Sequence, residues 1–123
     1  MEVLIVDDDD DIREVARLSL DLIGGWTVFV AASGAHAITH ARLRPPDVIL
    51  LDVMMPVMDG VETLRRLSAD PTTRHIPVIF LTAKAQTGER IELEAIGASG
   101  LIAKPFDPVT LPDEIELILS RPN

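Results

Sequence analysis

The sequence predicts an α/β fold, a doubly wound three-layer sandwich in which helices cover both faces of a parallel sheet. Two observations predict it. Five short apolar runs recur at regular spacing along the 123 residues, and each run is continuous and rich in β-branched residues. Such runs are typical of strands buried on both faces. The segments between them carry apolar residues at helical spacing, so strand and helix alternate five times with right-handed crossovers.

Each run and each intervening segment corresponds to one expected element. The expected strands are VLIV (3–6), WTVFVA (26–31), DVILL (47–51), IPVIFL (76–81) and GLIA (100–103). The expected helices cover residues 11–23, 34–43, 59–68 and 88–96, and a fifth follows the last strand. Ser33 is the expected N-cap of the second helix, and Gly97 ends the fourth.

The start of the fifth helix is less obvious, because two signals compete. Asp107 and Pro108 resemble an N-cap followed by proline at the first helical position. Pro112 would then fall in the second turn, where its missing N–H costs a hydrogen bond. Thr110, followed three residues later by Asp113, resembles a capping box. We therefore expect the regular helix to begin near Leu111.

The composition indicates one domain over residues 1–123. Hydrophobic residues make up 47% and aromatic residues 3%, so the core is expected to consist mainly of Val, Ile, Leu and Ala. The net charge of −9 argues against direct nucleic-acid binding and fits a protein that holds cations. The absence of cysteine excludes disulfides and zinc–thiolate sites. No apolar stretch approaches the roughly 20 residues that span a bilayer, and no signal peptide is evident, so a cytoplasmic protein is expected.

Polar residues follow four of the expected strands. Asp7 and Asp8 end the first strand, Asp52 the third, Thr82 the fourth and Lys104 the fifth. In an open parallel sheet, ligands bind beyond the carboxyl ends of the strands. If these strands are neighbours, three carboxylates, a hydroxyl and an ammonium group meet at one edge.

This set of groups favours a site for a phosphoryl group on a metal. Three carboxylates repel one another unless a cation lies among them, and Mg²⁺ commonly takes carboxylate, water and phosphate oxygens. Lys104 and Thr82 can neutralise and hydrogen-bond an incoming anion. Asp52 is a candidate nucleophile, because carboxylates form acyl phosphates. Phosphoryl transfer mainly needs such positioning and charge neutralisation.

Four motifs in order resemble the receiver domain of two-component response regulators. The motifs are VDDD (6–9), LLDVMMPVMDG (50–60), IFLTA (79–83) and KPF (104–106). The resemblance spans the whole chain and implies a flavodoxin-like, CheY-like fold with strand order 2-1-3-4-5. It also implies that Asp52 takes a phosphoryl group from the phosphohistidine of a histidine kinase with Mg²⁺ as cofactor.

The resemblance assigns a role to each of the other site residues. Asp8 would bind Mg²⁺ directly, Asp7 would act largely through water, and Met54 would lend its backbone carbonyl to the metal. Thr82 would turn its hydroxyl toward the phosphoryl group, and Lys104 would pair with it. The bond between Lys104 and the following proline is often cis in the family.

As a receiver, the protein would be a signalling module and not an enzyme beyond catalysing its own phosphorylation and dephosphorylation. Its partners would be a sensor histidine kinase or a phosphotransfer protein. Phosphorylation would switch the face formed by residues 84–119, through which the fourth helix, fifth strand and fifth helix would contact a downstream protein or a second copy. Neither direct nucleic-acid binding nor membrane contact is expected.

The chain departs clearly from the family at one position, Leu101, while Met54 and Lys84 occupy positions beside the phosphoryl group where receivers vary. Leu101 stands where receivers often carry an aromatic switch residue, so output is expected to rest on the Thr82 loop and the 88–96 helix. Met54 supplies no group that orients an attacking water, and Lys84 is placed to attract the phosphoryl group or block water. We therefore expect a long-lived phosphoryl group.

Several residues also have simpler interpretations. Asp9 to Asp11 are expected to cap and charge the first helix, where the helix dipole favours negative charge. Trp26 is expected to be half-buried near a sheet edge. Surface positions are expected for the three histidines, His36, His40 and His75.

Two other functions compete with a receiver. A haloacid-dehalogenase-type phosphatase would need a second acid two residues after the nucleophile, where this chain has Met54, and a cap domain. A pseudo-receiver that only binds partners would be signalled by loss of Asp8, Asp52 or Lys104, and all three are present.

Overall fold

The computed structural model describes residues 1–83 and 87–121. Its sheet has five parallel strands in the order β2-β1-β3-β4-β5, which confirms the predicted topology. The strands are β1 (Glu2–Val6), β2 (Thr27–Ala31), β3 (Val48–Asp52), β4 (Val78–Thr82) and β5 (Gly100–Ala103). Three strands begin a residue or two later than the apolar runs do, so Trp26, Asp47, Ile76 and Pro77 lie outside them.

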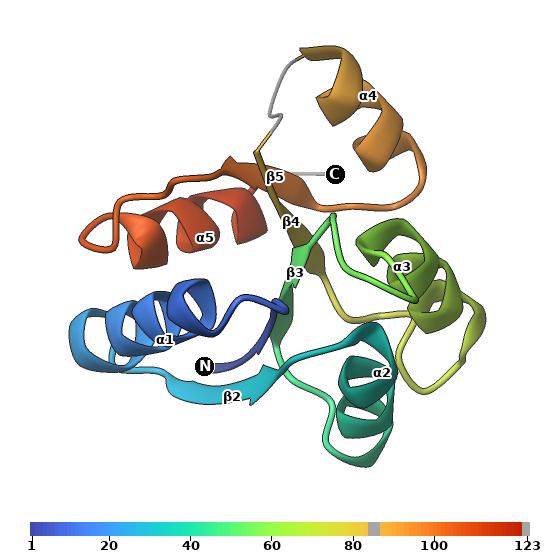
Figure 1. Ribbon diagram of the computed structural model, residues 1–123, viewed down its shortest axis with the longest axis horizontal. Coiled ribbons are helices and arrows are strands. Elements are labelled where there is room, and N and C mark those ends of the chain that lie inside the picture. Colours follow the sequence, from blue (N-terminus) through green and yellow to red (C-terminus); the bar gives the residue numbers. More distant parts are fainter. Residues whose placement is uncertain (84–86, 122–123) are drawn as a thin grey trace.

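Helices cover both faces of the sheet, as predicted (Figure 1). They are α1 (Asp10–Leu18), α2 (Gly34–Leu43), α3 (Gly60–Ala69), α4 (Thr87–Ala95) and α5 (Leu111–Leu119). Helices α1 and α5 lie on one side of the sheet, and α2, α3 and α4 on the other. The first helix continues beyond α1 as a π-helical turn, η1 (Ser19–Ile23), in which the buried Ser19 hydroxyl donates to the carbonyl oxygen of Pro108.

The core divides into two clusters, one on each side of the sheet. Neighbouring residues of a strand alternate between the clusters, as Leu50 and Leu51 of β3 and Ile79 and Phe80 of β4 show. Every residue of these two central strands is buried. The continuous apolar runs therefore arise because both faces of the sheet are covered. Among the described residues, none of the helices is long and apolar enough to cross a membrane.

The predicted caps of the first two helices are confirmed. The Asp9 carboxylate accepts hydrogen bonds from the backbone N–H groups of Asp11 and Ile12, at 2.9 and 3.2 Å. The Ser33 hydroxyl oxygen accepts one from the N–H of His36 at 3.2 Å. These bonds satisfy donors that the first helical turn leaves unpaired.

Helix α5 begins at Leu111 as expected, but the predicted capping box is wrong. The Thr110 side chain makes no capping hydrogen bond, and its backbone is already helical at φ −99° and ψ −7°. A turn begins earlier, because the carbonyl oxygen of Asp107 accepts from the N–H of Leu111 at 3.0 Å. The Asp107 carboxylate in turn accepts from the N–H of Val109 at 2.9 Å.

Two aromatic positions differ from expectation. Trp26 is buried, not half-buried, with 8% of its surface exposed, and belongs to the core cluster on the α1 and α5 side. Its backbone N–H donates to the carbonyl oxygen of Leu20 at 3.0 Å, which draws it under η1. His36 and His75 are exposed as expected, but His40 is partly buried with its ring centroid 4.9 Å from that of Phe29.

Asp70, at the end of α3, gives a testable dependence of stability on pH. Hydrogen bonds from the backbone N–H and hydroxyl of Thr72, together with Arg42 of α2 at 2.6 Å, lower the pKa of Asp70 to about 2. A lowered carboxyl pKa stabilises the fold above the unfolded value, 3.8, and this contribution is lost as pH falls toward 2. We expect the difference in unfolding free energy between wild type and Asp70→Asn to shrink between roughly pH 5 and pH 2, the pH range over which linkage predicts the loss. Urea denaturation at several pH values measures this difference. A difference that stays constant over this range would contradict the assignment.

Candidate functional site

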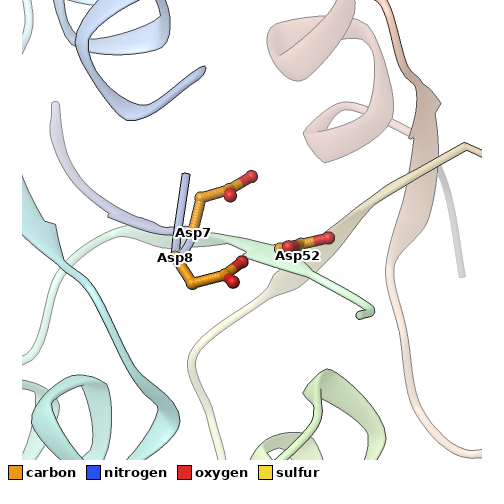
Figure 2. A group of neighbouring side chains, drawn as sticks. All are labelled: Asp7, Asp8 and Asp52. Atoms are coloured by element: carbon orange, nitrogen blue, oxygen red, sulfur yellow. The ribbon is translucent and has the colours of Figure 1, made fainter. Parts of the chain in front are cut away.

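The five polar residues singled out from the strand ends meet at one edge of the sheet. Asp7 and Asp8 directly follow β1, Asp52 is the last residue of β3, Thr82 ends β4 and Lys104 follows β5. The carboxylates of Asp7, Asp8 and Asp52 point to the same side of the strand ends (Figure 2). One oxygen from each lies within 4.8 Å of the others. The predicted convergence therefore exists in the folded chain.

Burial makes the charges of this site interdependent. Asp7 is fully buried and Asp52 is 4% exposed, so each carboxylate needs a partner to offset its lost hydration. The Lys104 ammonium nitrogen lies 2.8 Å from Oδ2 of Asp7 and 3.1 Å from Oδ1 of Asp52. One lysine thus bridges both buried carboxylates.

Backbone donors complete the hydrogen bonding of these carboxylates. The Asp7 carboxylate accepts from the N–H of Asp9 at 2.9 Å, and the Asp52 carboxylate accepts from the N–H of Met54 at 3.2 Å. The guanidinium of Arg13 donates to the backbone carbonyl of Asp7 at 2.8 Å. The turn after β1 and the loop after β3 therefore both help to position the site.

The protonation preferences of the site follow from burial and from the shared lysine. Burial raises the pKa of Asp52, the hydrogen bond from Lys104 opposes that rise, and repulsion from Asp7 adds to it. Burial alone would lower the pKa of Lys104, but its bonds to the two carboxylates outweigh burial and raise the pKa. Lys104 is therefore a permanent cation, whereas negative charge on Asp52 is costly in the metal-free protein.

The donor set fits a hard divalent cation. Asp8 is exposed, and its carboxylate makes no hydrogen bond or ion pair within the described part of the chain. Three carboxylates against one ammonium group leave the cluster with a surplus of two negative charges. Oxygen ligands with surplus negative charge are what Mg²⁺ and similar ions bind.

The loop between β3 and α3 approaches Asp52 closely. A Cβ atom on Gly60 would lie 2.3 Å from the carbonyl oxygen of Asp52, so only glycine fits there without displacing the backbone of the site. The N–H of Gly60 donates to the carbonyl oxygen of Val53 at 2.9 Å, which closes the loop. Met54 projects outward and is exposed, whereas Met55 packs in the core.

Val57 in the same loop is strained and offers a stability test. It is fully exposed and has φ of 68°, a left-handed conformation that β-branched residues rarely adopt. Val57→Gly relieves this strain, and we expect it to raise the unfolding free energy by about 1 kcal/mol after the entropy cost of glycine. Urea denaturation measures the change, and Val57→Ala, which keeps a Cβ, should gain less. A loss of stability in Val57→Gly would show that the conformation is unstrained.

Thr82 makes a contact that the sequence did not suggest. Its hydroxyl donates to Oε1 of Glu89 in the first turn of α4, at 2.6 Å. An acidic residue near the start of a helix is common, and only the fold brings this one to the end of β4. Leu101, in the position where an aromatic is frequent, is buried in the core. The peptide bond between Lys104 and Pro105 is cis, as expected. Lys84 lies outside the described residues.

Comparisons with known proteins agree on one family. The sequence model of the response regulator receiver domain family matches residues 3–116. The response regulator PleD of Caulobacter vibrioides is 44% identical over 111 residues, covering 89% of this chain and 24% of PleD. The response regulator Rre1 of Synechocystis is 35% identical over 119 residues, covering 97% of this chain and 50% of Rre1. The chain thus spans half or less of the length of these relatives.

A solved structure shows the same fold. The chemotaxis protein CheY4 of Vibrio cholerae aligns with a TM-score of 0.88 and 34% identity, covering 95% of this chain and 97% of CheY4. The five-stranded doubly wound fold and its acidic edge define a signalling module of the CheY-like class. The chain belongs to the response regulator receiver domain family.

Proposed function

We propose that Asp52 accepts a phosphoryl group from the phosphohistidine of a sensor histidine kinase or a phosphotransfer protein. The observation that carries the proposal is the position of the Asp52 carboxylate at the end of β3, beside two further carboxylates and the Lys104 ammonium group. In the transfer, an Asp52 oxygen forms a bond to phosphorus while the bond from phosphorus to the histidine nitrogen breaks. The bonding electron pair leaves with the imidazole nitrogen.

The surrounding residues bind and neutralise the transferred group. Lys104 is a permanent cation within 3.1 Å of Asp52, so it is placed to pair with a phosphoryl oxygen. Thr82 carries the hydroxyl that would donate to a second oxygen. Loss of the group by attack of water on phosphorus would return Asp52 and release inorganic phosphate. In this proposal the chain catalyses only these two reactions on itself.

Mg²⁺ would be held by the carboxylates of Asp7, Asp8 and Asp52 and by the backbone carbonyl of Met54. Support comes from the three clustered carboxylates and from the lack of a partner for Asp8 among the described residues. When bound, the ion supplies charge neutralisation for the phosphoryl oxygens.

The proposed output is a change in the face formed by α4, β5 and α5, within residues 84–119. Two of these elements carry exposed apolar side chains, Ile91 on α4 and Leu117 on α5, which suit contact with a downstream protein or a second copy. The net charge of −9 disfavours direct nucleic-acid binding. Residues 1–123 would act as one receiver domain, without membrane contact, in the cytoplasm where kinases form phosphohistidine from ATP.

Mass spectrometry after incubation with acetyl phosphate and Mg²⁺ tests the acceptor assignment. We expect the intact protein to gain the mass of one phosphoryl group and Asp52→Asn to gain none. Asp59→Asn serves as a control, because Asp59 lies in the loop after β3 but outside the three-carboxylate cluster. This variant should still gain the phosphoryl group. An adduct that persists in Asp52→Asn would place the acceptor elsewhere.

The exposed Met54 side chain predicts slow loss of the phosphoryl group. It has no polar group with which to orient an attacking water, and 78% of its surface is exposed beside the site. After removal of the donor, we expect the adduct to persist for minutes or longer, and Met54→Glu to shorten its lifetime. The measurement is the decay of the phosphorylated mass over time. A wild-type decay within seconds would refute the prediction.

A further inference from the structure

The bond between Thr82 and Glu89 joins the proposed site to α4. Thr82 is 4% exposed at the end of β4, and its hydroxyl donates to the Glu89 carboxylate at 2.6 Å. Hydrogen bonds to an ionised acceptor are shorter and stronger than those between neutral groups. The contact therefore restrains both the Thr82 side chain and the first turn of α4.

The phosphoryl group and Glu89 compete for a single hydrogen atom. A threonine hydroxyl carries one donor hydrogen. If Thr82 donates it to a phosphoryl oxygen on Asp52, it no longer donates it to Glu89. Two negatively charged acceptors, one on α4 and one at the strand end, thus define two alternative orientations of the same hydroxyl.

We propose that Glu89 is a positioning residue that holds the Thr82 hydroxyl away from the site until Asp52 is phosphorylated, and that release of this bond frees α4 to move. The proposal rests on the proposed phosphoryl acceptance by Asp52. In this proposal Glu89 couples the site to α4. Leu101 stands where receivers often carry an aromatic switch residue, and it has neither a ring nor a hydroxyl with which to do so.

Helix α4 is suited to respond to the loss of one bond. Within the described part of α4, Leu93 is the one side chain that is buried, whereas Ile91 is 63% exposed. Glu89 has no further hydrogen bond or ion pair within the described residues, so release of Thr82 leaves its carboxylate without another tie to the sheet. A helix held by few buried contacts opens at low free energy, as elements that move in switching do.

Rates of phosphoryl uptake from acetyl phosphate test the proposal. We expect Glu89→Ala to accelerate uptake by roughly three- to tenfold, because Thr82 no longer has to give up a charged acceptor. Glu89→Gln keeps an oxygen acceptor and should restore most of the restraint. Glu92→Ala removes an equal charge from an exposed position on the same helix and serves as the matched control.

Repeating the Glu89 substitution in a Thr82→Val variant separates the effect of the Thr82–Glu89 hydrogen bond from a general effect on the fold. Valine keeps the shape of threonine but has no hydroxyl, so Glu89→Ala should change the uptake rate of Thr82→Val by less than about twofold if the two residues act through their mutual bond. Slower or unchanged uptake in Glu89→Ala would overturn the proposal, and so would equal acceleration in both backgrounds.

Hydrogen exchange of α4 amides gives a readout that does not depend on the uptake rate. In wild type, phosphorylation should increase exchange in the first turn of α4. Unphosphorylated Glu89→Ala and Thr82→Val should already exchange at that faster rate, and Glu92→Ala should not. If wild type takes up phosphoryl groups without these differences, only the role of Glu89 fails. If wild type takes up none, the proposed function fails and this inference with it.

Discussion

Replacing Lys104 with methionine is expected to lower the unfolding free energy of the metal-free protein by about 3 kcal/mol. The ammonium group is the cation that offsets the buried carboxylates of Asp7 and Asp52, at 2.8 and 3.1 Å. Methionine fills a similar volume but leaves both carboxylates without a counter-charge among the residues that the structure describes. Urea denaturation in EDTA at neutral pH measures the loss.

Two further variants separate loss of the bridge from loss of one positive charge. Arg74 is exposed and has no ion pair within the described residues, so Arg74→Met should cost less than about 0.5 kcal/mol. Asp7→Asn combined with Lys104→Met should recover part of the loss, since one uncompensated charge is then gone. Millimolar Mg²⁺ should stabilise Lys104→Met more than wild type. A loss in Lys104→Met as small as that of Arg74→Met would show that the bridge contributes little.

Asp52→Asn is expected to raise the unfolding free energy of the metal-free protein by about 1 kcal/mol at neutral pH. Burial and repulsion from Asp7 raise the pKa of Asp52 despite the bond from Lys104, so its ionised form is disfavoured in the fold. Asparagine keeps the shape without the charge. The variant should lose phosphoryl uptake altogether, so the group that weakens the metal-free fold is the one that the proposed reaction needs.

The pH dependence of this difference has a definite sign. Because the pKa of Asp52 is raised on folding, the folded wild type binds a proton before the unfolded chain does as pH falls. The advantage of Asp52→Asn is therefore full at neutral pH and disappears once pH falls below the unfolded value of 3.8. Urea denaturation in EDTA at several pH values measures the difference.

Magnesium should reverse the order of stability. Loss of one of three carboxylates is expected to weaken Mg²⁺ binding at least about tenfold, so wild type gains more stability at a given Mg²⁺ concentration. Urea denaturation with and without Mg²⁺ measures both effects, and Asp59→Asn again serves as the control. A variant less stable than wild type in EDTA would contradict the direction of the Asp52 pKa shift.

Sequence patterns were sufficient for the sheet and for the composition of the site. Strands buried on both faces produce continuous apolar runs, and the first polar residue after each run marks its carboxyl end. Asp7, Asp52 and Lys104 were found in this way, and the structure places their charged groups within about 3 Å, hydrogen-bonding reach. The start of α5 at Leu111 was predicted from Pro112 and from a capping box at Thr110, and the start is confirmed although Thr110 does not cap the helix.

Features that depend on packing between distant elements were not predictable. The burial of Trp26 depends on η1 lying over it, and the failure of Thr110 as a cap depends on a turn that begins at Asp107. The partial burial of His40 depends on its contact with Phe29 of β2. Each is decided by a neighbour whose position no local pattern encodes.

The sequence by itself determined the alternation of strands and helices, the two-sided core and the identity of the acidic and basic groups at the sheet edge. Periodicity and polarity are local properties, and a parallel sheet converts them directly into a shared edge. Only the tertiary structure decided how the charges are partnered: that Lys104 bridges both buried aspartates, and that Thr82 is bonded to Glu89 of α4. The physical reason is that hydrogen bonds and ion pairs act over about 3 Å, and only the packed fold sets distances at that scale.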